Sequence, residues 1–153
     1  SRGLGDVYKR QLQYHTERRK KMEELVRNAI CQYNDYVAEA KLLGKWLEQA
    51  DDPTAKTTCT ILELKIAIIN AWLNVLNADE KFVVRKHLIE EMEWPRVAFE
   101  YRERWKNEFA RTERSLQVYQ ANALAKIVAF ADKHREITLR LFYDVPRTPR
   151  VID

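Results

Sequence analysis

Apolar residues recur with helical spacing over the first third of the chain. Between Thr16 and Ala50 they return at every seventh position in two series: Met22, Ala29, Tyr36 and Leu43, and Val26, Tyr33, Ala40 and Leu47. Such a stripe is typical of a helix that packs against a partner helix. Pro53 ends the pattern, because proline lacks an amide donor and disfavours helix at the preceding residue. The spacing predicts one helix from Thr16 to about Ala50.

The next segment, from Ala55 to Leu76, is apolar on most sides. Its thin polar strip runs through Glu63, Asn70 and Asn74. A helix of this kind is normally buried, so we expect it to be the central helix of an N-terminal lobe. It either folds against the preceding helix as a hairpin or contacts a second copy of the chain. We favour the hairpin, with weak self-association as a homodimer.

Two shorter helices are predicted next. Asn77 is a suitable N-cap, and Asp79 and Glu80 follow in the first turn, where the helix dipole favours anions. Residues 91–93 form a turn. Trp94-Pro95 opens the following helix, because proline is well tolerated in a first turn. The apolar side of that helix consists of Trp94, Val97, Ala98, Tyr101 and Trp105.

A long helix begins after Thr112, which is a suitable N-cap followed by Glu113 in the first turn. Its inner face is apolar and consists of Leu116, Tyr119, Ala123 and Ile127. The opposite face, near the start, carries Arg114, Gln117, Val118 and Ala121. Arginine pairs with guanine edges, glutamine with adenine, and small apolar groups with the thymine methyl.

This layout is that of a helix-turn-helix unit, whose last helix enters the major groove of DNA. We therefore predict that this helix binds duplex DNA, that Arg111 and Lys126 contact phosphate, and that the other DNA-binding residues are Thr112, Glu113, Arg114, Gln117, Val118 and Ala121. The alternative is an ordinary amphipathic surface helix. A run of four cations from Arg18 to Lys21 is interpreted as a solvated helix start, with phosphate contact as its alternative.

Composition supports an all-α fold. The 153 residues include only 3 Gly and 4 Pro, and 33% are charged. The net charge of +4 permits binding to nucleic acid without demanding it. Cys31 and Cys59 stand apart with no CxxC motif, which argues against a disulfide framework or a zinc site and suits a reducing cytoplasm. No apolar run reaches the roughly 18 residues that a membrane span requires.

Catalytic chemistry is not predicted. His15, His87 and His134 have no metal-ligand spacing, and the chain has no GxSxG motif and no glycine loop that would cradle phosphate. We expect neither an enzyme nor a cofactor.

Four parts of the chain are predicted. Residues 1–11 are interpreted as foreign, because DVYKRQ (Asp6–Gln11) resembles the translation of a sequencing-library adapter; a native basic arm is the alternative. Residues 12–76 form the N-terminal lobe and residues 77–143 the helix-turn-helix domain. Residues 144–153 form a tail broken by Pro146 and Pro149.

The segment LNADEKFVVRKHLIEEMEWPRVAFEY resembles region 4 of bacterial sigma factors, with Val97-Ala98 at the Ile-Ala of that pattern. RTERSLQVYQANALAKI resembles the ArpU/RinA-type transcriptional regulators of phages and prophages, and the resemblance covers roughly Ala55–Phe130. It implies a regulator of late packaging or lysis genes that acts in the bacterial cytoplasm, with host RNA polymerase as a further partner. Alternatives are a small-terminase-like protein that binds packaging sites, and a helical assembly or adaptor protein that uses the stripe from Met22 to Leu47 without contacting DNA.

One departure from the pattern concerns spacing. Leu116 follows Val97 by 19 positions, more than a compact helix-turn-helix unit has. Either the helix that starts at Trp94 runs two turns further, or Arg104–Arg111 forms a longer connection. We expect the connection, with Trp105 and Phe109 anchored against the core.

Overall fold

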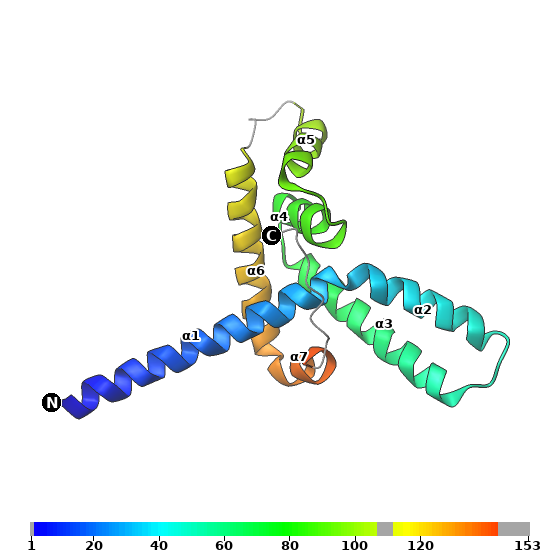
Figure 1. The fold of residues 1–153 in the computed structure, drawn as a ribbon, viewed down its shortest axis with the longest axis horizontal. Coiled ribbons are helices and arrows are strands. Elements are labelled where there is room, and N and C mark those ends of the chain that lie inside the picture. Colours follow the sequence, from blue (N-terminus) through cyan, green and yellow to red (C-terminus); the bar gives the residue numbers. More distant parts are fainter. Residues whose placement is uncertain (1, 107–111, 144–153) are drawn as a thin grey trace.

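The computed structural model describes residues 2–106 and 112–143, and over these ranges it contains helices and no strand, which confirms the all-α class. The helices are α1 (Arg2–Cys31), α2 (Tyr33–Leu47), α3 (Pro53–Asn74), α4 (Ala78–Val83), the π-helix η1 (Val84–Ile89), α5 (Trp94–Arg104), α6 (Glu113–Lys133) and α7 (Arg135–Phe142) (Figure 1). Residues 3–11 are an exposed continuation of α1. The predicted tail, residues 144–153, lies outside the described residues.

The expected single helix from Thr16 to Ala50 is wrong, because the chain bends at Gln32. The backbone hydrogen bonding continues through the bend, with the Tyr36 amide donating to the Gln32 carbonyl oxygen at 3.0 Å. Just beyond it, Asn34 Nδ2 donates to the Ile89 carbonyl oxygen at 3.3 Å, which ties the start of α2 to the end of η1. This tertiary contact accounts for a bend at a residue that is neither glycine nor proline.

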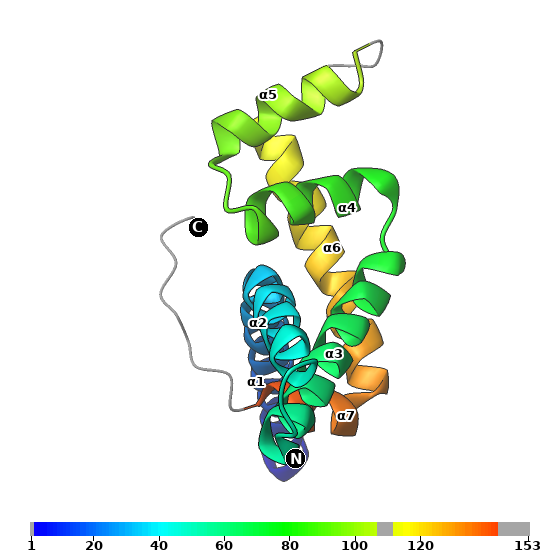
Figure 2. The ribbon, with the colours of Figure 1, turned by 90° about the vertical axis from the view of Figure 1, so that its right-hand side faces the viewer.

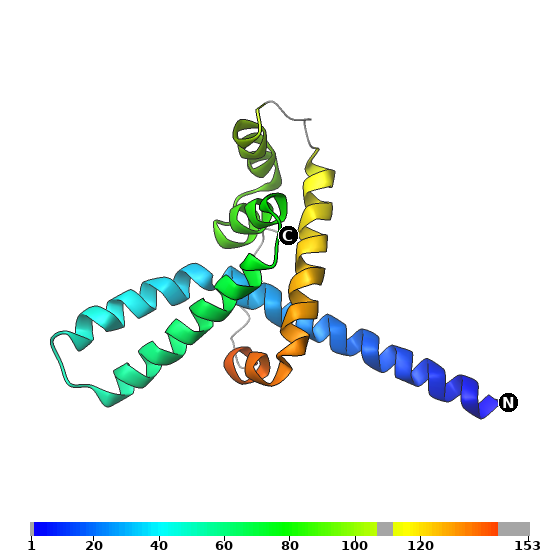
Figure 3. The same ribbon diagram turned by 180° about the vertical axis from the view of Figure 1, so that it is seen from behind.

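The bend divides the predicted heptad stripe between two neighbours. On α1, Met22, Val26 and Ala29 are buried in a core that also contains residues of α6. On α2, Tyr36 is buried, and α2 lies alongside α3 (Figure 3). The buried part of the stripe is therefore used inside the fold, whereas Leu43 and Leu47 near the end of α2 stay partly exposed.

The helix α3 begins and runs close to where the sequence predicts it. Asp52 caps it, with its Oδ1 accepting a hydrogen bond from the Ala55 amide at 3.0 Å. This bond, with a second one from the Trp46 indole, holds the pKa of Asp52 below its usual value. The expectation that α3 is buried nearly all round holds only for part of it, because Ile61 and Leu64 are exposed.

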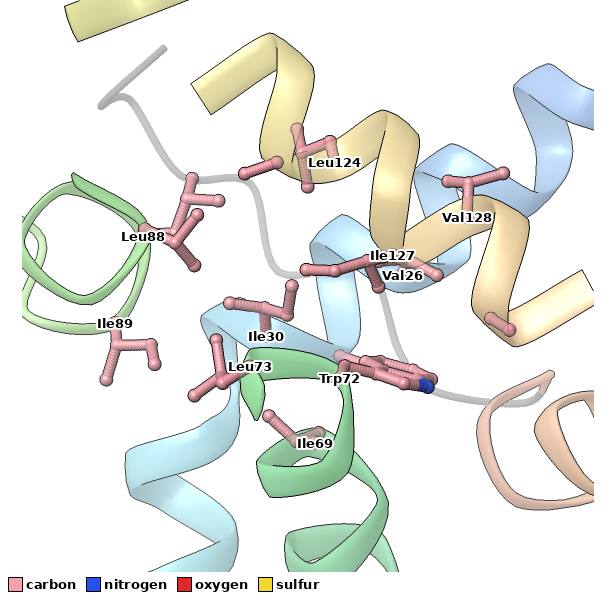
Figure 4. Close-up of a cluster of buried hydrophobic side chains, with 14 of the residues drawn as sticks. Val26, Ile30, Ile69, Trp72, Leu73, Leu88, Ile89, Leu124, Ile127 and Val128 are labelled. Carbon is pink, nitrogen blue, oxygen red and sulfur yellow. The ribbon is translucent and has the colours of Figure 1, made fainter. Parts of the chain in front are cut away.

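The main hydrophobic core lies where α1, α3, η1 and α6 meet (Figure 4). Trp72 fills its centre at 1% exposure, and Phe142 of α7 packs on it with ring centroids 5.2 Å apart. The core takes side chains from both sides of the predicted boundary between Leu76 and Asn77. The two predicted units thus share one core.

Candidate nucleic-acid interface

Thr112 caps the start of α6 as predicted. Its Oγ1 accepts a hydrogen bond from the Ser115 amide at 3.1 Å, which satisfies one of the amides that a helix start leaves unpaired. Leu116, Ala123 and Ile127 are fully buried, so the predicted inner face is confirmed. Because these three residues face inward, the opposite side of the same turns faces solvent.

That opposite side carries the residues predicted to read bases. Arg114, Gln117, Val118 and Ala121 are all exposed, Val118 by 51%. Neither Arg114 nor Gln117 makes an ion pair or a hydrogen bond with any described residue. At 100° per residue the four side chains fall within about a third of the helix circumference. They form one open face, whose role stays a prediction.

A second, smaller core holds the start of α6 in place. Leu116 packs with Val83, Val97 and Tyr101, residues of α4 and α5. Both of these helices lie beside α6 (Figure 2). The Tyr101 hydroxyl donates to Asp79 Oδ1 at 2.8 Å and so joins α5 to the first turn of α4. Because α4 and α5 both contact α6, the direction of the exposed face is fixed by packing.

Trp105 directly follows the last residue of α5 and shows how part of the long segment between Val97 and Leu116 is arranged. Its ring lies 5.1 Å from that of Phe82 and 4.4 Å from that of Tyr101. The helix stops at Arg104, so the longer connection is confirmed over Trp105 and Lys106, and Trp105 is anchored as expected. Phe109 and Arg111 lie outside the described residues.

The turn between η1 and α5 is held by a buried histidine. His87 Nδ1 donates to the Met92 carbonyl oxygen at 2.8 Å, and its ring stacks on Trp94 with centroids 3.9 Å apart. The backbone of Glu91 adopts a positive φ of 60°, which reverses the chain within this turn. Burial lowers the pKa of His87 below 6.5, the value of a free histidine.

This burial predicts a pH dependence of stability. Below about pH 6.5, His87 binds a proton more readily in the unfolded chain than in the folded chain. The free energy of unfolding therefore decreases as the pH falls through that value. We expect the melting temperature of the wild type to drop between pH 7.5 and 5.5 and that of His87→Gln to change less. His134→Gln, which removes an exposed histidine, should behave as the wild type. Equal pH profiles for the wild type and His87→Gln would refute this role.

A groove between α5 and α6 adjoins the exposed face. Arg102 of α5 lines it together with Arg114 and Gln117, and Thr112 and Glu113 lie at its rim. Sequence reasoning missed Arg102, which lies one helical turn after the buried Ala98 and therefore on the same side of α5. The groove places two arginines from different helices beside one glutamine.

Lys126 has a structural partner that the sequence did not indicate. Its Nζ donates to Glu80 Oε1 at 2.8 Å, and the Glu80 side chain is 5% exposed. The same Glu80 oxygen accepts from the Asn77 amide at 3.0 Å, and Asn77 Oδ1 accepts from the Glu80 amide at 2.9 Å. Lys126 therefore joins α6 to a capping box on α4, and we remove it from the phosphate-contacting set.

No family model, curated protein or solved structure matches the chain. Over residues 2–106 and 112–143, none of the helices has both the length and the apolar character needed to cross a bilayer. The same residues bring together no cluster of His, Cys, Asp and Glu suited to hold a metal ion, and Cys31 and Cys59 form no disulfide with each other.

Proposed function

We propose that the chain binds duplex DNA with the exposed face of α6. In this proposal α4, η1, α5 and α6 act as a helix-turn-helix unit, with α2 and α3 as a helical hairpin behind it. The observation that carries the proposal is the open face of Arg114, Gln117, Val118 and Ala121 on a capped helix whose inner face is fully buried. A capped helix suits insertion into the major groove when an arginine and a glutamine near its start are not paired with any described residue.

Each of these side chains has a defined part in recognition. Arg114 supplies two parallel donors for the O6 and N7 of guanine, and Gln117 a donor and an acceptor for adenine. Val118 and Ala121 offer apolar contact to a thymine methyl. Arg102, on the neighbouring helix, lies where it can contact the phosphates beside the groove. Glu113 adds no attraction to phosphate, but its carboxylate can accept from cytosine N4.

Replacing Arg114 by alanine should weaken binding to the preferred site by about 1–3 kcal/mol and relax the preference at one base pair. The measurement is selection of a bound sequence from a random duplex library, followed by titration of the selected and scrambled duplexes. Arg140→Ala is the matched control, because Arg140 is an exposed arginine of α7 that pairs with Glu136. If Arg114→Ala kept both affinity and preference, Arg114 would not read a base.

We further propose a regulatory role in transcription, with host RNA polymerase as a partner, in a phage or prophage. The support is the resemblance to ArpU/RinA-type regulators and to sigma region 4. A small-terminase-like protein would use similar contacts. The position of the selected DNA site separates them, since a regulator binds upstream of a promoter and a terminase subunit binds at a packaging site.

A second candidate function is assembly without DNA contact. It is favoured by four exposed apolar side chains on α2 and α3: Leu42, Trp46, Ile61 and Leu64. Exposed apolar side chains mark protein interfaces where they form a contiguous patch. Sedimentation of the chain at increasing concentration, together with DNA titration, separates the two functions, because an assembly protein self-associates and ignores DNA.

A further inference from the structure

The cations of α1 lie beside the exposed face of α6. The N-terminal half of α1 extends away from the body of the molecule, and α1 crosses α6 near the middle of α6 (Figure 1). The first half of α6 and the extended half of α1 thus form the two sides of an open angle. The run from Arg18 to Lys21 lies on α1 close to the corner of this angle.

A groove of about 840 Å³ occupies that corner. From α1 it is lined by His15, Arg18 and Arg19, and from α6 by Ala121, Ala125 and Ala129. Ala121 belongs to the face that we propose to read DNA, and Ala125 continues that face one turn further along α6. The groove is therefore continuous with the proposed recognition surface.

Four charged side chains line the groove, the cations Arg18 and Arg19 and the carboxylates Glu23 and Asp132. With respect to the described residues, Arg18 and Asp132 are paired, whereas Arg19 and Glu23 are not. Arg18 pairs with Asp132 at 3.6 Å, and Asp132 also accepts from Arg135 at 3.2 Å. Glu23 lies on the groove wall as a second carboxylate. Arg19 is exposed and makes no ion pair or hydrogen bond with any described residue. It is the cation that remains available to an anionic partner.

The distribution of charge along the chain also favours contact between α1 and an anionic partner. The helix α1 carries eight Lys and Arg against four Asp and Glu, an excess of four that equals the net charge of the whole chain, +4. From Leu12 to Cys31 the excess is still two, five cations against three anions. Residues 12–31, which exclude the segment interpreted as foreign, therefore carry half of the excess positive charge of α1.

The proposed recognition residues lie near the groove that α1 lines. At 1.5 Å per residue, Gln117 and Ala125 are about 12 Å apart along α6. A duplex bound at Arg114 and Gln117 presents phosphates within such a distance, because it carries one negative charge about every 1.7 Å along its axis.

We propose that α1 is a second DNA-binding element, in which Arg19 contacts the phosphate backbone of a duplex whose major groove holds α6. The inference rests on the proposed DNA binding by α6. Only part of the cation run takes part, because Lys21 faces away from the angle and lines a different pocket with Arg135 and Phe142. Lys21 is therefore a matched control on the same helical turn.

The test compares Arg19→Gln with Lys21→Gln in the full chain, by titrating duplexes of selected and scrambled sequence between 50 and 200 mM salt. Arg19→Gln should weaken binding to both duplexes about five- to tenfold at 0.1 M salt and lower the salt slope by about one unit, with the preference unchanged. Lys21→Gln should leave slope and affinity near those of the wild type. Melting curves establish that both variants fold.

Three other outcomes would contradict either the role of α1 or the proposed function, and the titrations distinguish them. Equal losses of DNA affinity in Arg19→Gln and Lys21→Gln would show a general effect of net charge and would contradict the role of α1. Wild-type affinity for Arg19→Gln would do the same while leaving binding by α6 intact. If the wild type itself failed to bind either duplex, the proposed function would fail, and the inference with it.

Discussion

Replacing Trp72 by alanine should lower the free energy of unfolding by about 3–5 kcal/mol, the usual cost of removing a large buried aromatic side chain. Trp72 is 1% exposed and packs on Phe142 at the point where α3 and α7 meet the main core. The loss combines the transfer energy of the indole with the cavity that remains. Urea unfolding followed by circular dichroism measures it.

Trp46→Ala is the matched control for Trp72→Ala. Trp46 is 51% exposed, and its main contact is the hydrogen bond from Nε1 to Asp52 Oδ2 at 3.1 Å. Its replacement should cost less than about 1 kcal/mol. Similar losses for the two variants would contradict the packing of α3 described above.

Replacing Lys126 by methionine should cost about 2–3 kcal/mol, because it leaves the buried Glu80 carboxylate without its cation. The estimate lies below that for a fully buried pair because the Lys126 side chain is 49% exposed. The salt slope of DNA binding should stay unchanged, since the Lys126 ammonium is bound to Glu80. A lower salt slope in a folded variant would restore Lys126 to the phosphate-contacting residues.

The double variant Glu80→Gln with Lys126→Met isolates the buried charge. Glutamine at position 80 keeps an oxygen that can accept from the Asn77 amide, as Glu80 does at 3.0 Å, but carries no charge. We therefore expect the double variant to recover most of the stability lost in Lys126→Met. A double variant as unstable as the single one would show that the loss comes from packing of the lysine stem.

Local chemistry made several elements predictable. Thr112 and Asn77 are capping residues by type, and both cap the helices expected of them. Trp94-Pro95 opens α5 as its residue types indicate. The inner face of α6 followed from periodicity, because a helix must turn its apolar side towards the core. The exposed face opposite was predictable for the same reason.

Long-range contacts account for what the sequence did not reveal. Lys126 and Glu80 are 46 positions apart, and nothing in the residues around either of them indicates the other. The bend at Gln32 accompanies a contact between α2 and η1, 55 positions apart. The packing of α1 across α6 is also a long-range contact. The sequence alone therefore could not show that the run from Arg18 to Lys21 lies beside α6.

The central claim, that the chain binds duplex DNA, is tested most directly by the salt dependence of binding by the wild type. Fluorescence anisotropy of a labelled duplex would be followed from 50 to 200 mM salt. We expect the logarithm of the binding constant to fall linearly with that of salt concentration, with a slope of about −2 to −4, as two to four phosphates are neutralised. No binding at 50 mM salt and micromolar protein, or a binding constant independent of salt, would contradict the claim.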